Sequence, residues 1–221
     1  MKKLRSKIIL AIDDASFFNK LGDVSELLAG VKLGFPIFLE LNILNIKNII
    51  LKNNIKNIII DLKLADIGDI MISSVSKLID IGDGFIAHSF IGKEESLDKL
   101  KKFLDDNNKK LYLILSMSHP GWRDEFFYDH LKRIIAEVDP YGIVVPATKP
   151  QIIERARNDF PKKVIISPGV GTQGAPFGIG LCKGSDYEII GRSITKSIRP
   201  REIILKIIEA QERMLNECKK G

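Results

Sequence analysis

Three charged residues with the spacing Asp-x-Lys-x-x-Asp follow a strongly apolar run in the chain: Asp61, Lys63 and Asp66. Residues 58–60, just before them, are all isoleucine, which is typical of a buried parallel strand. Side chains alternate along a strand, so Asp61 and Lys63 are expected on the same side at its end. Buried carboxylate and ammonium groups are unfavourable unless they are paired. The pattern therefore indicates either an ion pair at a strand end or the charged part of a functional site.

Strand-like segments recur along the chain, and helix-like segments separate them. The predicted strands cover residues 6–12, 30–34, 57–63, 84–88, 110–117, 142–145, 164–167 and 187–190. The predicted helices cover residues 16–30 (broken near Gly22), 37–53, 69–82, 93–107, 124–138, 151–159 and 201–218. Strands that alternate with helices in this way predict an α/β protein, a single-domain (β/α)8 TIM barrel over residues 1–221. The alternative is an open doubly wound sheet, which usually has a glycine-rich turn where this chain has Asp13 and Asp14.

Polar residues gather in the predicted strands near their ends, or just after them. They are Asp13, Lys32, Asp61, Lys63, Asp66, His88, Ser118, His119, Gln173 and Arg192. Catalytic residues of a TIM barrel come from the carboxyl ends of the strands and from the loops that follow. This concentration of polar side chains at one end of one barrel predicts an active site there.

The loops after the last two predicted strands suggest a phosphate site. Gly169, Gly171 and Gly174 would let backbone amides approach an anion, and Arg192 can offer a bidentate guanidinium group. Barrels often bind phosphate at this position. Ordinary glycine turns and a solvated arginine are the alternative interpretation.

The three histidines do not have the spacing of a metal site. We expect His88 to make a structural hydrogen bond, His119 to shape its turn and His130 to lie on a helix surface. No metal ligand is predicted among them.

The charge of the chain favours small anionic partners over nucleic acid. The net charge is +6, but lysine and arginine are spread along the chain and mixed with acidic residues. Aromatic residues make up only 7% of the sequence, which leaves little for stacking on bases. We therefore expect no nucleic-acid partner.

The sequence also predicts a cytoplasmic protein with no membrane partner. The basic N-terminus (Lys2, Lys3, Arg5 and Lys7) is followed by an apolar run too short for a signal peptide, and no apolar stretch is long enough to span a bilayer. Cys182 and Cys218 are far apart and form no metal or redox motif, so we expect reduced thiols in a reducing compartment.

With these residues in place, the whole chain resembles the orotidine 5′-phosphate decarboxylases of the short archaeal type. The motifs that carry the resemblance are Val31-Lys32-Leu33-Gly34, Asp61-x-Lys63-x-x-Asp66-Ile67, Met117-Ser118-His119-Pro120-Gly121, residues 167–174 (SPGVGTQG) and Gly191-Arg192-Ser193. Each motif alone is moderately specific, and their order on successive strands makes the set strongly specific. The resemblance implies conversion of orotidine 5′-phosphate to UMP and carbon dioxide, the last step of de novo pyrimidine synthesis, with no metal and no cofactor.

The resemblance also implies roles for the charged residues. Lys32, Asp61, Lys63 and Asp66 would surround the reacting carbon of the pyrimidine with alternating charges, and Lys63 would protonate C6 as carbon dioxide leaves. Asp66 and Ile67 would enter the site of a neighbouring subunit, so the active unit would be a homodimer.

Six further residues are implied to bind the substrate. These are Asp13 for the ribose hydroxyls, Ser118 for the pyrimidine edge, Pro168 for the apolar part of the pocket, Gln173 as a bridge between base and phosphate, and Gly191 with Arg192 for the phosphate.

One position departs from the family pattern. The family usually has a threonine four residues after the second aspartate of the motif, where it reaches the partner's ribose, and here that position is Ile70. That contact would be lost, or replaced by Asp69 or a water molecule.

Two alternatives follow from this departure and from the phosphate site. Gly68 and Ile70 are similar to a sister family, the metal-dependent 3-keto-L-gulonate 6-phosphate decarboxylases, which take a metal-binding carboxylate from the second strand. Lys32 stands at or near that place here and would repel a divalent cation. A non-catalytic barrel that binds a nucleotide phosphate is the other alternative, although it would have no need of the charged motif.

Overall fold

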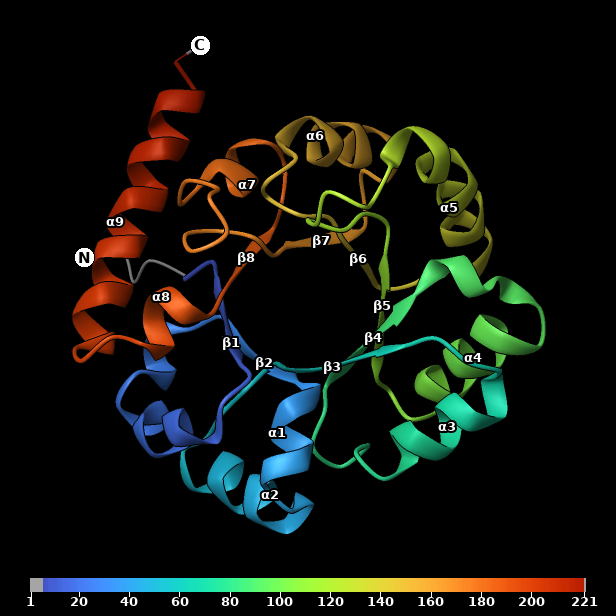
Figure 1. Cartoon of the computed structure of the whole chain (residues 1–221), viewed down its shortest axis with the longest axis horizontal. Coiled ribbons are helices and arrows are strands. Elements are labelled where there is room, and N and C mark those ends of the chain that lie inside the picture. Colours follow the sequence, from blue (N-terminus) through green and yellow to red (C-terminus); the bar gives the residue numbers. More distant parts are fainter. Residues whose placement is uncertain (1–5, 221) are drawn as a thin grey trace.

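The predicted strands close into one parallel barrel. The computed structural model describes residues 6–220, and within them eight strands pair in sequence order, with the last strand returning to the first. The strands are β1 (Ile8–Ile12), β2 (Gly30–Gly34), β3 (Ile58–Leu64), β4 (Gly84–His88), β5 (Lys110–Ile114), β6 (Gly142–Val144), β7 (Val164–Ser167) and β8 (Tyr187–Ile190). In Figure 1 they form an inner ring with the helices outside it. The TIM barrel is therefore confirmed, and the open sheet is wrong.

Helical segments connect consecutive strands. The short segments are η1 (Ala15–Asp23), η2 (Ser25–Leu27), η3 (Ser89–Ile91) and η4 (Lys93–Leu97). The α-helices are α1 (Phe35–Glu40), α2 (Ile43–Lys52), α3 (Gly68–Ser76), α4 (Asp98–Asp106), α5 (Asp124–Val138), α6 (Pro150–Asp159), α7 (Ile179–Cys182), α8 (Arg192–Thr195) and α9 (Pro200–Cys218). Within residues 6–220, no helix has the length and hydropathy of a bilayer-spanning segment. Of the predicted basic N-terminus, Lys2, Lys3 and Arg5 lie outside the described residues.

Several predicted helices are shorter or broken, mostly for local reasons. Residues 15–27 form two 3₁₀ segments, η1 and η2, that meet at Val24, whose backbone is not helical. The helix predicted for 37–53 is interrupted because Asn42 is extended and caps α2 by accepting the Asn45 amide at 2.8 Å. The helix predicted for 93–107 becomes α-helical only at Asp98, since Glu95 has a φ of 55°. The helix predicted for 69–82 ends at Ser76.

The strands bury both faces, which explains their nearly continuous apolar sequences. In β1, Ile9 packs inside the barrel, whereas Ile8 and Leu10 pack between the barrel and the helices. The inner layer also contains Ala11, Ile59, Ile86, Tyr112, Ile114, Val144, Ile166 and Ile189. The upper part of this layer forms the floor of the site described below.

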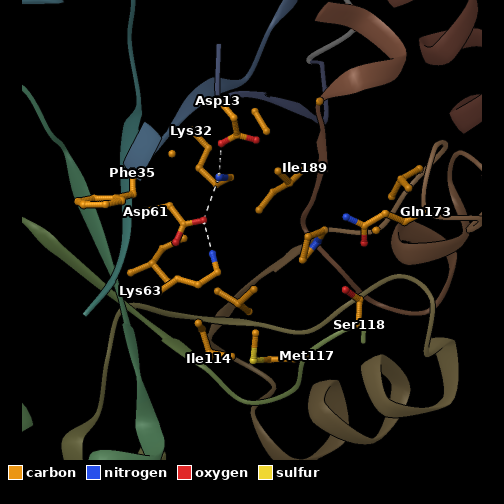
Figure 2. A pocket seen from close by; sticks show the side chains of 18 of the residues that line it. Asp13, Lys32, Phe35, Asp61, Lys63, Ile114, Met117, Ser118, Gln173 and Ile189 are labelled. Atoms are coloured by element: carbon orange, nitrogen blue, oxygen red, sulfur yellow. Dashed lines mark hydrogen bonds and ion pairs between the residues drawn. The ribbon is translucent and has the colours of Figure 1, made fainter. Parts of the chain in front are cut away.

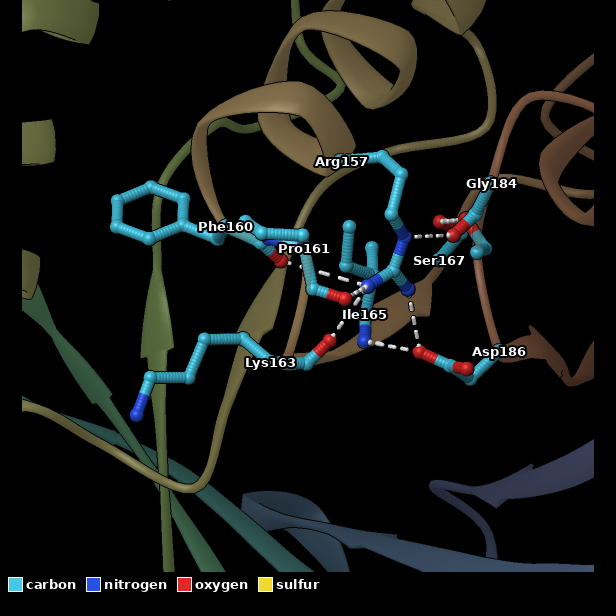
Figure 3. A network of polar contacts seen from close by, with 9 residues as sticks. Arg157, Phe160, Pro161, Lys163, Ile165, Ser167, Gly184 and Asp186 are labelled. Carbon is cyan, nitrogen blue, oxygen red and sulfur yellow. Dashed lines mark hydrogen bonds and ion pairs between the residues drawn. The ribbon is translucent and has the colours of Figure 1, made fainter.

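A network around Arg157 joins the turns that lead into β7 and β8 (Figure 3). Arg157 of α6 donates to the carbonyls of Gly184 and Lys163 at 2.8 and 2.9 Å, and it pairs with Asp186 at 2.6 Å. Asp186 also accepts the amide of Ile165 at 2.8 Å. The guanidinium group thereby satisfies backbone groups that the sheet leaves unpaired at the amino-terminal ends of two strands.

The cysteines are not free thiols. Cys182 ends α7 and forms a disulfide with Cys218 at the end of α9, with 5.9 Å between the two Cα atoms. The expectation of reduced thiols is wrong, because α7 packs against α9 and brings together residues that are 36 positions apart. Separation along the chain alone does not reveal this packing.

Candidate active site

A cavity of about 480 Å³ opens at the carboxyl ends of the strands. Apolar residues of the inner barrel layer form its floor, among them Ile86, Ile114, Val144 and Ile189. Polar residues from the strand ends and the following loops form its walls, as Figure 2 shows. The cavity lies at the end of the barrel where the sequence places the site.

Lys32, Asp61 and Lys63 form one connected group of charges on a wall of this cavity. Asp61 Oδ2 accepts a hydrogen bond from Lys63 Nζ at 2.7 Å and pairs with Lys32 Nζ at 2.9 Å. Lys32 Nζ also lies 3.8 Å from Asp13 Oδ1, at the end of β1. Figure 2 shows the resulting order Asp13, Lys32, Asp61, Lys63, in which negative and positive groups alternate. One chain therefore brings together four of the charged residues singled out in the sequence.

The Asp61 carboxylate remains ionised in this setting. Burial would raise the pKa of Asp61, but the ammonium groups of Lys32 and Lys63 outweigh it and lower the pKa below its ordinary value of 3.8. Asp61 Oδ1 is buried and has no hydrogen-bond partner among residues 6–220. An ionised oxygen without a partner is unfavourable inside a protein, so its presence indicates a functional role for Asp61 rather than a structural one.

An irregularity in β3 places Lys63 beside Asp61. Ile60 pairs with Phe85 and Leu64 pairs with Ala87, so residues 61–63 lie opposite Ile86 alone. Lys63 has a φ of 47°, a left-handed conformation that is uncommon for a residue with a side chain. Simple strand alternation therefore predicts the correct side for Lys63 but not the bulge that puts it there.

The wall opposite the charged group contains the predicted substrate-binding residues. Ser118, Pro168, Gln173, Gly191 and Arg192 all line the cavity. Figure 2 shows Ser118 and Gln173 across the cavity from Lys63. One side of the cavity therefore carries the connected group of charges, and the other side carries loop residues and the guanidinium group of Arg192.

The glycine loop after β7 is held by its own amides. Gly169, Gly171 and Gly174 have φ values of 96°, 72° and 103°. The amide of Gly171 donates to the carbonyl of Ala175 at 2.8 Å, and that of Gly174 donates to the carbonyl of Gly171 at 2.8 Å. The amides of Gly171 and Gly174 are thus used within the loop, and the approach of other loop amides to an anion stays a prediction.

Asp66 and Ile67 are not among the residues that line the cavity. Both are exposed just before α3, and Ile67 is 60% exposed, an unusual environment for an isoleucine. The Asp66 carboxylate accepts the amide of Ile67 at 2.7 Å. Ile70 is also exposed, and Asp69 pairs with Lys99 at 3.4 Å, so Asp69 already has a partner. The structure of one chain thus keeps Asp66 and Ile67 apart from the other candidates.

Sequence reasoning missed several residues that line the cavity. Ser116 has a buried hydroxyl with no hydrogen-bond partner among the described residues, and Phe35, Met117 and Thr172 also contribute to the lining. Ser116 lies two positions before Ser118, so strand alternation could have identified it. Met117 and Thr172 belong to motifs that carry the family resemblance but were given no role, and Phe35 has no signal of its own in the sequence.

The histidines take no part in lining the cavity. His88 Nδ1 is buried without a partner in the described part of the chain, so the expected structural hydrogen bond is absent from that nitrogen. Burial and the nearby Lys63 ammonium group lower the pKa of His88. His119 accepts the amide of Trp122 through its carbonyl at 3.1 Å, and His130 is exposed on α5. Residues 6–220 contain no group of three or more His, Cys, Asp or Glu side chains placed to hold a metal ion.

The chain is similar to known proteins of one family. The sequence model of the orotidine 5′-phosphate decarboxylase / HUMPS family matches residues 6–207. An orotidine 5′-phosphate decarboxylase from Sulfurisphaera tokodaii is 52% identical over 96% of this chain and 99% of its own length.

Two solved structures are similar throughout. The orotidine 5′-monophosphate decarboxylase from Sulfolobus solfataricus has a TM-score of 0.90 and 43% identity, covering 95% of this chain and 99% of that one. The orotidine 5′-monophosphate decarboxylase from Methanocaldococcus jannaschii, complexed with inhibitor BMP, has a TM-score of 0.84 and 30% identity. The match covers 96% of this chain and 100% of that one. On the match to residues 6–207 and the identity over nearly the whole chain, this protein belongs to the orotidine 5′-phosphate decarboxylase / HUMPS family.

Proposed function

We propose that this protein decarboxylates orotidine 5′-phosphate to UMP and carbon dioxide, completing pyrimidine nucleotide synthesis without a metal or a cofactor. The observation that carries the proposal is the Lys32–Asp61–Lys63 group, with Asp61 buried and ionised on the wall of a cavity large enough for a nucleotide. A barrel that only bound a nucleotide would not need this unfavourable arrangement.

The chemical step needs a fixed positive charge at the carbon that loses the carboxylate. When the bond between C6 and the carboxylate breaks, its electron pair stays on C6 and carbon dioxide leaves. Lys63 Nζ, held 2.7 Å from Asp61 and about half exposed to the cavity, supplies the proton that C6 receives. A preorganised ammonium group stabilises the developing carbanion without a cofactor. Asp61 keeps Lys63 in place, and Lys32 balances the charge of Asp61.

The other cavity residues hold the rest of the substrate. Gly191 and Arg192 bind the phosphate at the mouth, and Gln173 bridges phosphate and base from the loop after β7. Ser118 reads the pyrimidine edge, Pro168 packs on the ring, and Asp13 binds the ribose hydroxyls. Phosphate binding far from C6 can then favour closure of the loop over the reacting atoms.

A second copy of the chain completes each site. Asp66 and Ile67 are exposed at a loop tip outside their own cavity, which supports their insertion into the cavity of a partner subunit. There Asp66 would place a second carboxylate beside Lys63. The active unit is then a homodimer of single-domain barrels, with Ile70 in place of a polar contact to the partner's ribose.

The reaction belongs in the cytoplasm, because charged nucleotides do not cross membranes unaided. The Cys182–Cys218 disulfide would suit this location in a hyperthermophilic host, whose intracellular proteins commonly keep disulfides.

The loss of ultraviolet absorbance of orotidine 5′-phosphate tests the function directly. Wild-type protein with a chelator should turn over, Lys63→Ala should lose nearly all activity, and Lys206→Ala on the exposed side of α9 should match wild type. Activity only on a sugar-acid phosphate after magnesium is added would instead support the sister family. Binding of UMP with no turnover of either substrate would leave a nucleotide-binding barrel.

A further inference from the structure

The loop that contains Gln173 ends at a buried carboxylate that the proposed reaction does not use. Glu188 lies in β8 and is fully buried. Its neighbour Ile189 faces the barrel interior, so Glu188 faces the helices outside. An ionisable side chain between a sheet and its helices is unusual, and the contacts of Glu188 indicate its role.

Glu188 connects the strand to three other parts of the chain. Its Oε1 accepts the amides of Gly178 and Gly180 at 3.0 and 2.9 Å. Its Oε2 accepts the amide of Gly178 and the side-chain nitrogen of Gln211, both at 2.9 Å. Gly178 closes the loop after β7, Gly180 lies in α7, and the buried Gln211 lies in α9. One carboxylate therefore holds the end of the loop to β8 and α9.

The end of the loop is seated tightly and depends on these contacts. A Cβ at Gly178 would come within 2.7 Å of Met214 Cβ and 3.0 Å of Gln211 Cα, and Gly178 has a φ of 93°. The following helix, α7, has only four residues, which is too short to be stable on its own. The position of the loop end is thus set by tertiary contacts.

The buried carboxylate of Glu188 combines a desolvation cost with several hydrogen bonds. Burial raises the pKa of Glu188, although hydrogen bonds from Gln211 and from the amides of Gly178 and Gly180 oppose that rise. An apolar side chain of similar size would avoid the desolvation of a carboxylate, but it would leave the amides of Gly178 and Gly180 and the side chain of Gln211 without their acceptor. The use of Glu188 therefore lies in the geometry that it imposes.

We propose that Glu188 is a positioning residue that anchors the end of the loop at residues 168–178 and thereby sets the place of Gln173 relative to the substrate phosphate. β8 carries this anchor on its outer face and leads directly into Gly191 and Arg192, which line the cavity. β8 thus positions the loop that contains Gln173, through Glu188, and it also positions Gly191 and Arg192 at its own end. This proposal rests on the proposed function, because it concerns the phosphate of that substrate.

The test compares ligands with and without a phosphate. Glu188→Gln keeps one acceptor oxygen for the amides of Gly178 and Gly180, but its NH₂ group cannot accept the hydrogen bonds that Gly178 and Gln211 donate to Oε2. The KM for orotidine 5′-phosphate should rise roughly tenfold, as expected for loss of a charged hydrogen bond, with a smaller change in kcat. The preference for UMP over uridine in calorimetric binding should shrink by a similar factor. Gly178→Ala keeps the carboxylate but displaces the loop end, and it should cause the same loss.

Arg157→Lys is the matched control, because Arg157 also anchors the connection between α7 and β8 but at the opposite end of the barrel. It should lower the melting temperature and leave KM and the preference for UMP unchanged. If Glu188→Gln and Gly178→Ala lower only the melting temperature, Glu188 has a purely structural role and the proposal is wrong. An inactive wild-type protein would refute the proposed function, whereas the comparison of UMP with uridine would still decide the role of Glu188.

Discussion

At the scale of single residues, the centre of the cavity combines backbone strain with opposed charges. Lys63 has a left-handed backbone at the point where β3 and β4 shift register. Such strain persists when the surrounding structure enforces it, and it is common at functional sites. Here it brings the Lys63 ammonium group within 2.7 Å of the buried Asp61 carboxylate.

Replacement of Lys63 by two small residues should expose this strain. Lys63→Gly and Lys63→Ala both remove the ammonium group and should both abolish turnover. Glycine tolerates a φ of 47° and alanine does not, so Lys63→Gly should be more stable by about 1 kcal/mol. Denaturant unfolding of the two variants measures the difference. Greater stability of Lys63→Ala would mean that the left-handed conformation is not kept in solution.

The Asp61 carboxylate should make the stability of the protein sensitive to acid. Its pKa is lowered in the folded state by Lys32 and Lys63, which outweigh the effect of burial, so the folded state favours the ionised form relative to the unfolded state. The contribution is fully present above the unfolded pKa and is lost as pH falls through the folded pKa. The free energy of unfolding of wild type minus that of Asp61→Asn should be constant above about pH 5 and decrease below it. A difference that grows with acidity would contradict this assignment.

At the scale of elements, the loop after β7 requires glycine for two different reasons. Gly171 has a positive φ, and a Cβ there would come within 2.5 Å of Ser193 Oγ and 3.0 Å of the Phe177 ring. Gly174 also has a positive φ, but no atom would lie within 4 Å of its Cβ. Conformation limits both positions, and packing against α8 limits only the first.

Alanine substitutions at these two glycines form a matched pair. Both variants should lose about 1 kcal/mol of stability from backbone strain. Gly171→Ala should also displace the loop from α8 and lower kcat/KM roughly a hundredfold, since small misplacements near a reacting group have large effects. Steady-state kinetics of the two proteins with orotidine 5′-phosphate makes the comparison. Equal losses in kcat/KM would show that the contact with α8 has no part in positioning the loop.

Elements with a strong local signal were predictable from the sequence, and features set by contacts between elements were not. The isoleucine run before Asp61 predicts β3 correctly, because burial on both faces demands a continuous apolar sequence. The bulge at Lys63 depends on how β3 pairs with β4, so the sequence of β3 alone does not predict it. Asn42 is a helix-capping residue type, and greater weight on that signal would have divided the helix predicted for 37–53.

At the scale of the whole molecule, several exposed apolar residues bear on the proposed homodimer. Ile67 and Ile70 flank the start of α3, and Phe35 and Phe90 lie exposed after β2 and β4, the strands on either side of β3. Exposed apolar groups of this kind are typical of surfaces that bind a partner. The insertion of Asp66 into a neighbouring cavity is consistent with them.

Mixing two inactive variants tests the shared site. Lys63→Ala and Asp66→Ala should each be inactive alone, because every site then lacks one of the two groups. In mixed dimers, one site receives Lys63 and Asp66 from the two different chains, while the other site lacks both. Refolding the variants together at equal amounts should therefore restore roughly a quarter of wild-type activity, with half of the dimers mixed and one intact site in each. If mixed dimers verified by mass spectrometry recover no activity, Asp66 acts in its own chain's site. An active Asp66→Ala protein would instead place Asp66 outside catalysis.

The disulfide between Cys182 and Cys218 has a consequence for damage to the chain. β8, α8 and nearly all of α9 lie between the two cysteines, so they belong to one covalent ring. A protease that cuts once inside this ring leaves both fragments attached. Because β8 pairs with both β7 and β1, the strand that completes the barrel then stays at a high effective concentration near its place. The nicked barrel can close again, whereas the same cut in the reduced protein would release its C-terminal part.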